Sequence, residues 1–136
     1  MKRTYVDSGV LIAAARGKGR LGDRALEIIC DTASREFISS DYVRLETVPK
    51  PTYFGRAAEV RFYEEFFSTV ATWLPFDSTH LEIAFEEACK SGLSSVDAVH
   101  VVLASLAGCD ELVTSEKPTA AIHRTARVRI VSIDVD

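Results

Sequence analysis

Short apolar runs alternate with longer amphipathic segments along this chain, and this alternation limits its fold more than any other feature. Four runs have the length of buried strands, at residues 3–6, 36–39, 71–74 and 111–114, and the alternating stretch 127–133 is a candidate edge strand. Helical segments separate them, at residues 8–15, 21–32, 54–70, 79–90 and 94–107, and a short helix starts at Ser40 or Asp41 and ends before Pro49. This order predicts an α/β fold with a central, mostly parallel four- to five-stranded sheet covered on both faces.

Length and composition indicate an ordinary globular protein. The 136 residues suit a single domain over 1–136, and 47% of them are hydrophobic and 26% charged. The net charge of -4 does not favour nucleic-acid binding, so such binding would need a local basic patch. We expect a cytoplasmic protein with no membrane span, because no apolar run is long enough for one and the cysteines suggest a reducing compartment. These cysteines, expected to be buried, are Cys30, Cys89 and Cys109.

Three acidic residues lie near the points where strands give way to helices: Asp7, Glu46 and Asp97. Each has an ordinary explanation, since Asp7 can cap a helix, Asp97 can complete a capping box with Ser94, and Glu46 can lie on a solvated helix face. In a parallel sheet, however, side chains that follow different strands meet at one edge. Two unit charges about 4 Å apart repel by roughly 4 kcal/mol at an effective dielectric of about 20. Converging carboxylates would therefore require protonation or a divalent cation, and Mg²⁺, or Mn²⁺ as a substitute, suits them.

Four motifs follow one another in the chain: Tyr5-Val6-Asp7-Ser8-Gly9-Val10-Leu11-Ile12, Ser39-Ser40-Asp41-Tyr42-Val43-Arg44-Leu45-Glu46, Leu93-Ser94-Ser95-Val96-Asp97-Ala98-Val99-His100 and Leu112-Val113-Thr114-Ser115-Glu116. In order, spacing and total length they resemble the PIN-domain ribonucleases, and within that family the VapC-type toxins of bacterial toxin–antitoxin pairs. The resemblance implies a PIN-like three-layer α/β/α fold and a metal-dependent endoribonuclease that hydrolyses RNA with a metal-activated water. It also implies a small antitoxin partner, and a homodimer or a heterotetramer or larger assembly with that antitoxin.

The same resemblance assigns roles to individual residues. The catalytic set would be Asp7, Glu46, Asp97 and Glu116, with metal held by Asp7, Asp97 and Glu46 and with Thr114 in support. Glu116 departs from the family pattern, which usually has Asp there, and the longer side chain puts a second metal site in question. Asp110 cannot replace it, because Asp110 precedes its strand and so lies at the wrong end of the sheet. His100 is expected to pack or to hold another ligand, since Mg²⁺ prefers oxygen.

Two further segments have both an ordinary and a functional interpretation. The basic loop with Arg16, Lys18 and Arg20 is either simply solvated or a candidate contact for RNA phosphates or for an acidic segment of a partner. Aromatic and apolar residues recur every four positions from Phe54 to Val70, through Ala58, Phe62 and Phe66. This repeat is either core packing or part of a groove or dimer face for a partner.

Two other classes of function compete with the nuclease. A non-catalytic PIN-like binding module, with a decayed fourth acidic position at Glu116, would bind Mn²⁺ weakly and cleave no RNA. An aspartyl-phosphate enzyme or receiver could also place Asp7 at the end of its first strand. A phosphatase of that kind needs a second Asp two residues later, where this chain has Gly9. The nuclease is therefore the leading hypothesis.

Overall fold

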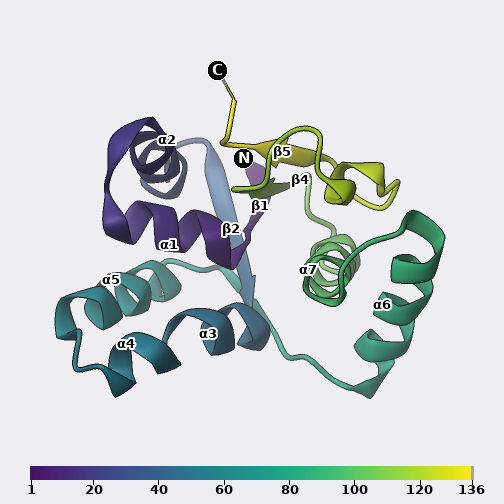
Figure 1. Ribbon diagram of the computed structural model, residues 1–136, viewed down its shortest axis with the longest axis horizontal. Helices are drawn as coiled ribbons and strands as arrows, with labels where there is room; N and C mark the ends of the chain where they lie inside the picture. Colours follow the sequence, from purple (N-terminus) through teal and green to yellow (C-terminus); the bar gives the residue numbers. More distant parts are fainter. Residues whose placement is uncertain (136) are drawn as a thin grey trace.

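Five parallel strands form one sheet at the centre of the computed structural model, which describes residues 1–135 (Figure 1). The order across the sheet is β3-β2-β1-β4-β5. The strands are β1 (Lys2–Val6), β2 (Arg35–Ser40), β3 (Thr72–Leu74), β4 (Glu111–Thr114) and β5 (Ile130–Ser132). Every pairing between these strands is parallel. The expected mostly parallel sheet is confirmed, including the edge position of its last strand.

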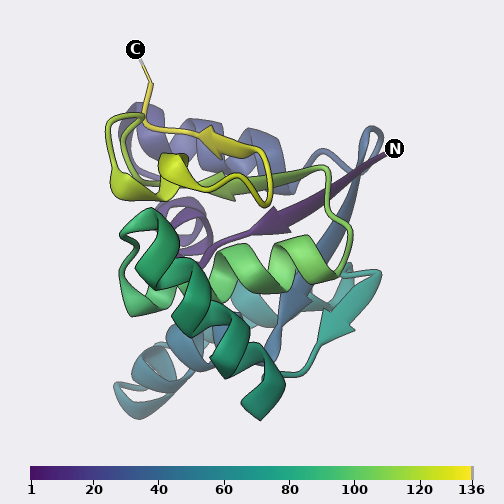
Figure 2. The same ribbon diagram turned by 90° about the vertical axis from the view of Figure 1, so that its right-hand side faces the viewer.

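Helices cover both faces of the sheet and complete a three-layer α/β/α arrangement, as Figures 1 and 2 show. One layer holds α1 (Ser8–Arg16), α2 (Gly19–Ile29), α3 (Asp41–Thr47), α4 (Pro49–Tyr53) and α5 (Ala57–Ser68). The other holds α6 (Ser78–Ser91), α7 (Ser95–Leu106) and the short 3-10 helix η1 (Ala121–Arg124). The strand order explains this division, because the chain moves one way across the sheet from β1 to β3 and then back to β4. The expected three-layer fold is confirmed.

The core lies where β1 and β4 meet α7. Tyr5 and Val6 of β1 and Leu112 and Val113 of β4 are fully buried, and the side chains of α7 are buried from Ala98 to Ala104. Strands covered on both faces need apolar residues at successive positions, which is why they read as continuous apolar runs. The carboxyl ends of these strands lie at a common edge, and the polar residues that follow them are the candidates for a site.

One helix was not expected from the sequence. α3 ends at Thr47, before Pro49 as predicted, but Pro49 then begins α4. Proline fits the first turn of a helix, because the N–H that it lacks has no partner there in any case. Pro49 therefore limits α3 and also begins α4.

The aromatic repeat of the sequence only partly matches the buried face of α5. Phe66 is buried and its ring lies 5.3 Å from that of Phe37, so its core role is established. Phe54, by contrast, is 61% exposed and precedes the helix. The residue buried most deeply on α5 is Tyr63, which lies outside the four-residue repeat. The double substitution of Phe62 and Phe66 to Asp would be a natural test of the repeat as a docking face for a partner. Because Phe66 is buried, this variant would damage the core and could not give that test.

The cysteines are less buried than expected. Cys30 and Cys89 are exposed and Cys109 is partly buried, and all three are free thiols. The expectation that they act as buried apolar residues is wrong for Cys30, which follows the end of α2, and for Cys89 on the exposed side of α6, whereas Cys109 packs against the core. Among the described residues, no helix is both long enough and apolar enough to cross a membrane.

Candidate active site

Asp7, Asp97 and Glu116 lie near one another at the carboxyl edge of the sheet. Asp7 directly follows β1 and caps α1, its Oδ1 accepting a hydrogen bond of 3.1 Å from the Val10 backbone N–H. Asp97 lies in the first turn of α7, where its backbone N–H donates to Ser94 Oγ at 3.2 Å. The capping role of Asp7 is therefore confirmed, whereas the capping box of Ser94 and Asp97 is only half formed: Ser94 caps α7, but within the described residues the Asp97 carboxylate makes no return bond to the Ser94 N–H. The Asp97 carboxylate is thus not used by the cap.

The third acid, Glu116, follows β4 and is fixed by its backbone. Its N–H donates to Thr114 Oγ1 at 3.1 Å, and its carbonyl accepts from the Ser132 hydroxyl of β5. Thr114 is fully buried and its hydroxyl also acts on Asp7, whose pKa it lowers. The supporting role suggested for Thr114 thus has a structural basis, because one hydroxyl touches the segments that carry the first and the last acid.

Mutual repulsion marks these acids as a cluster. Burial raises the pKa of Asp7, which is only 7% exposed, and the charge of Asp97 raises it further against the lowering effects of Thr114, His100 and the Val10 N–H. Burial likewise raises the pKa of Glu116 to about 7, and the neighbouring Asp97 carboxyl and the charge of Asp7 add to this. Near neutral pH the cluster is therefore poised between holding a proton and holding a cation.

Glu46 is held separately by a buried hydrogen-bonded chain. His100 Nε2 donates to Glu46 Oε1 at 2.6 Å, and His100 Nδ1 lies 2.8 Å from the Tyr5 hydroxyl. Tyr5 Oη lies 2.8 Å from Ser40 Oγ, which accepts from the Val43 N–H and so caps α3. The Tyr5 hydroxyl can donate to one of its two neighbours and accept from the other, so the chain satisfies the hydroxyls of Tyr5 and Ser40 together. Burial keeps the pKa of Tyr5 far above its usual range, which leaves its proton in place.

The sequence indicated a supporting role for His100 but not the two residues that hold it in place. His100 is 2% exposed and holds another acid, which agrees with the expectation that it packs or supports a ligand. Tyr5 and Ser40 were missed as its partners. A Tyr inside a buried strand and a His on a buried helix both need hydrogen-bond partners, and that requirement was the available signal.

The chain of hydrogen bonds predicts a measurable contribution to stability. Replacing Tyr5 by Phe removes the hydroxyl between Ser40 and His100 and leaves His100 Nδ1 without its hydrogen-bond partner. We expect a loss of about 1 kcal/mol in the free energy of unfolding, measured by urea denaturation. Tyr42→Phe is the matched control, since the Tyr42 ring packs beside His100 while its hydroxyl makes no hydrogen bond within the described residues. Equal stabilities of the two variants would contradict the chain.

The donor set fits a hard divalent cation. Its members are carboxylates, and Glu116 Oε2 is buried without a hydrogen-bond partner among the described residues. Two ionised carboxylates cannot hydrogen-bond to each other, so a shared proton or a cation is needed to satisfy that oxygen. Within residues 1–135, no three His, Cys, Asp or Glu side chains are already arranged to hold a metal ion. A partial set of oxygens still suits Mg²⁺, which keeps several of its waters.

A hollow with basic residues adjoins the acids. The hollow is a cavity of about 520 Å³ between α1, the start of α2 and the segment after β4. Its lining residues are Gly9, Ile12, Ala13, Arg16, Lys18, Leu21, Gly22 and Ser115. Ser115 stands beside Glu116 and packs directly on Gly9, where an added Cβ would lie only 2.1 Å from Ser115 Oγ. The basic loop thus lies next to the acids, with Arg16 and Lys18 on the hollow and Arg20 exposed at the start of α2.

Comparison with known proteins gives a family and a fold. A family model described as the PIN domain matches residues 4–128. No curated protein sequence matches the chain. Among solved structures, VapBC from Salmonella typhimurium bound to DNA matches with 18% identity and a TM-score of 0.72, over 98% of this chain and 99% of that one.

Two further solved structures are similar. VapBC2 from Rickettsia felis, bound to a DNA fragment from its promoter, has 10% identity and a TM-score of 0.71, covering 96% of this chain and 98% of that one. The Mycobacterium tuberculosis toxin VapC20, which cleaves the Sarcin-Ricin loop, has 18% identity and a TM-score of 0.64 over 80% of this chain and 86% of its own. At these identities the structures establish a shared fold.

Proposed function

The chain belongs to the PIN-domain family, and on this premise we propose that it is a metal-dependent endoribonuclease and the toxin of a toxin–antitoxin pair. The observation that carries the proposal is the cluster of Asp7, Asp97 and Glu116, three acids from distant parts of the sequence, in which burial and the neighbouring carboxylates raise the pKa of Asp7 and of Glu116. A fold gains little from gathering like charges, so such a cluster is most readily explained by a function.

In this proposal Asp7 and Asp97 hold the cation, Mg²⁺ or Mn²⁺, and Glu116 is an outer ligand. When bound, the cation neutralises these carboxylates and lowers the pKa of a coordinated water. Glu46 serves the reaction differently, by orienting water or contributing to metal binding. His100 donates to one carboxylate oxygen of Glu46, while the side chain stays 22% exposed, so Glu46 can accept a proton from a water beside the RNA phosphate.

The partners follow from the family and from the named structural neighbours. Two of those neighbours are VapBC complexes, in which a VapC-type chain is paired with an antitoxin. We propose a small antitoxin for this chain as well, together with a homodimer or a heterotetramer or larger assembly, and a cytoplasmic location.

Removal of divalent cations is expected to stop RNA cleavage. The protein should degrade a mixture of cellular RNAs in Mg²⁺ or Mn²⁺, lose that activity in excess EDTA, and recover it when the cation is restored. Without a cation, the negatively charged carboxylates would repel the RNA phosphate and no water would be activated. Gel analysis of the RNA gives the readout, with RNA incubated in the same buffers without protein as the control. Cleavage that persists in EDTA would contradict the metal-dependent mechanism.

The alternative function is a non-catalytic binding module. Two observations favour it: Glu116 stands where the family usually has Asp, and the described residues contain no preformed three-ligand metal cluster. A decayed enzyme of this kind should cleave no RNA at any cation concentration. If the shorter carboxylate of Glu116→Asp restored cleavage to an inactive wild type, the decayed fourth position would be established.

A further inference from the structure

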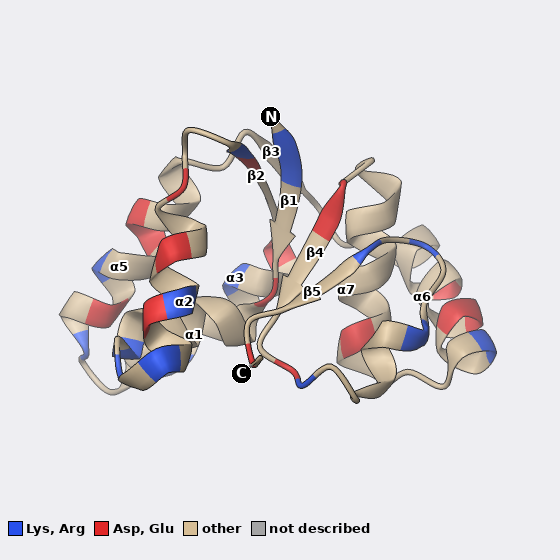
Figure 3. Cartoon of the chain, turned by 90° about the horizontal axis from the view of Figure 1, so that it is seen from above, with Lys and Arg blue, Asp and Glu red and all other residues tan. Residues whose placement is uncertain are grey.

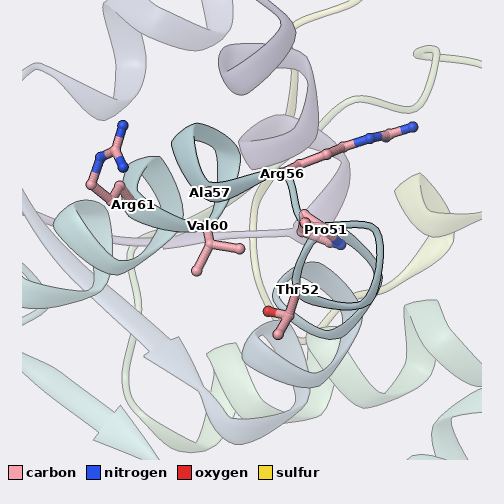
Figure 4. A pocket seen from close by; sticks show the side chains of 7 residues that line it. Pro51, Thr52, Arg56, Ala57, Val60 and Arg61 are labelled. Carbon is pink, nitrogen blue, oxygen red and sulfur yellow. The ribbon is translucent and has the colours of Figure 1, made fainter.

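Beyond the acidic cluster, three adjoining hollows run from the proposed active site over one helix layer. The first, described above, starts beside the acids at Gly9 and Ser115 and ends at Arg16. Arg16 also lines the second hollow, of about 500 Å³, together with Phe62 and Arg56. Arg56 and Ala57 in turn line the third, of about 370 Å³, which ends at Arg61 (Figure 4). Shared lining residues therefore connect the three hollows into one path, which we call the basic track.

The cations along the basic track are available to a ligand. Arg16, Lys18, Arg56 and Arg61 are exposed, and none of them pairs with a carboxylate within the described residues. By contrast, Arg44 is engaged by an acid in the hollow beside Trp73, where it binds Glu64 at 3.3 Å. Figure 3 shows that the basic segments of the α1–α2 loop and α5 lie on the same side of the molecule. In a chain of net charge -4, this concentration of unpaired cations is the local basic patch that binding to nucleic acid requires.

The other residues of the track suit unpaired nucleotides. Phe62 is partly buried in the second hollow, and Ile12, Ala13 and Leu21 give the first an apolar lining. Aromatic and apolar surfaces interleaved with cations are the chemistry by which proteins hold single-stranded nucleic acid. One acid, Glu59, also lines the second hollow, but its carboxylate accepts a hydrogen bond of 2.7 Å from the Tyr63 hydroxyl.

We propose that the basic track binds a single-stranded RNA segment on one side of the scissile phosphate. This inference rests on the proposed function for the position of that phosphate at the acids. From Gly9 to Arg16 the track follows seven residues of α1, about 10 Å at 1.5 Å per residue, and it then continues over α5. An acidic peptide is a poorer fit, because it has no bases to fill the apolar parts of the hollows.

Binding of RNA without cleavage tests the track separately from catalysis. The probe is a fluorescently labelled 12-nucleotide single-stranded RNA, titrated with protein in EDTA and followed by anisotropy. The test variant combines Arg56→Glu and Arg61→Glu, and the matched control combines Lys90→Glu and Arg129→Glu, which change the net charge equally but lie away from the track. Circular dichroism melts verify folding. If the test variant fails to fold, Arg16→Ala with Lys18→Ala takes its place.

The track variant should bind the RNA at least about tenfold more weakly than wild type. Losing two phosphate contacts should also make the slope of log affinity against log salt about 1.4 shallower, at about 0.7 per contact in a single strand. The control should stay within about twofold of wild type. Equal weakening in both variants would indicate bulk charge and overturn the proposal.

Unchanged RNA affinity in the track variant would also overturn it, and loss of poly-glutamate binding in the same variant would then assign the track to an acidic peptide. RNA binding on the track by a protein that never cleaves would contradict the proposed nuclease function and leave the track in place.

Discussion

Asp97→Asn is expected to lower RNA cleavage by about 100-fold or more, the scale on which preorganised electrostatic groups act in active sites. Asp97 is the acid that connects the cluster, because its carboxylate raises the pKa of both Asp7 and Glu116. Asparagine keeps the size of the side chain and removes the charge that holds a cation. The helix cap at Ser94 should survive, since it binds the backbone N–H of residue 97. The protein should therefore stay folded while cleavage and Mn²⁺ affinity fall together.

The control for this substitution is Asp110→Asn. Asp110 lies at the opposite end of the sheet, where its Oδ2 accepts a hydrogen bond of 2.8 Å from the Arg3 backbone N–H, as its place before β4 predicted. Cleavage assays and calorimetric Mn²⁺ titrations of both variants give the comparison. Full activity in Asp97→Asn would remove the acidic cluster from the mechanism, and metal binding without cleavage in wild type would point to the decayed-site alternative.

Cation affinity is expected to rise about 100-fold between pH 5 and pH 7. The pKa of Glu116 is raised to about 7, from an ordinary value of 4.5, so the metal-free cluster holds a proton through most of that range. A cation must displace this proton, and displacement of one proton makes affinity change about tenfold per pH unit. Above about pH 7 the dependence should flatten. Mn²⁺ titrations at several pH values measure the profile.

The same shift predicts how stability varies with pH in the metal-free protein. A carboxyl whose folded pKa lies above its unfolded pKa binds more protons in the folded state, so its stabilising effect is complete below about pH 4.5 and is lost as pH rises to about 7. Glu116→Gln should remove the part of this loss that Glu116 causes and make the affinity profile less steep, leaving the contribution of Asp7, whose pKa burial also raises. A wild-type affinity profile no steeper than that of Glu116→Gln would rule out proton competition at Glu116.

Much of the fold was readable from the sequence. β4 occupies the predicted range, β1 begins one residue earlier than predicted, and β2 extends one residue further at each end, because strands buried on both faces are apolar throughout. α4 was missed because proline ends helices and also begins them, and only the tertiary path decides between the two. The choice of Tyr63 over Phe62 for the core was also beyond the sequence. A helix with aromatic residues on adjoining positions has two plausible buried faces, and packing selects one.

The candidate site also has parts that the sequence predicted and parts that it did not. The topological argument expected Asp7, Glu46 and Asp97 to meet, and Glu116 was added by the family resemblance. Asp7 and Glu116 follow the neighbouring parallel strands β1 and β4, whose carboxyl ends lie at one edge, and Asp97 joins them from the first turn of α7. The position of Glu46 was not predictable, because it depends on how α3 packs beside α7 and on the side-chain conformation that lets His100 reach it at 2.6 Å. The basic loop was recognised as a candidate RNA contact, but Arg56 and Arg61 were not, since their link to Arg16 runs through space between α1 and α5.

The contact between Gly9 and Ser115 has a consequence for the accuracy of the site. Because position 9 carries no side chain, the loop that bears Glu116 rests on the helix that begins after Asp7 with only a hydrogen atom between them. The close approach of the Ser115 side chain to Gly9 thus fixes how near the two segments that carry Asp7 and Glu116 lie to each other. The carboxylate side chains can still change rotamer, while the backbone positions that carry them keep their spacing. A site with such fixed spacing should bind ions whose radius matches that spacing more tightly than ions that would require the backbone to move.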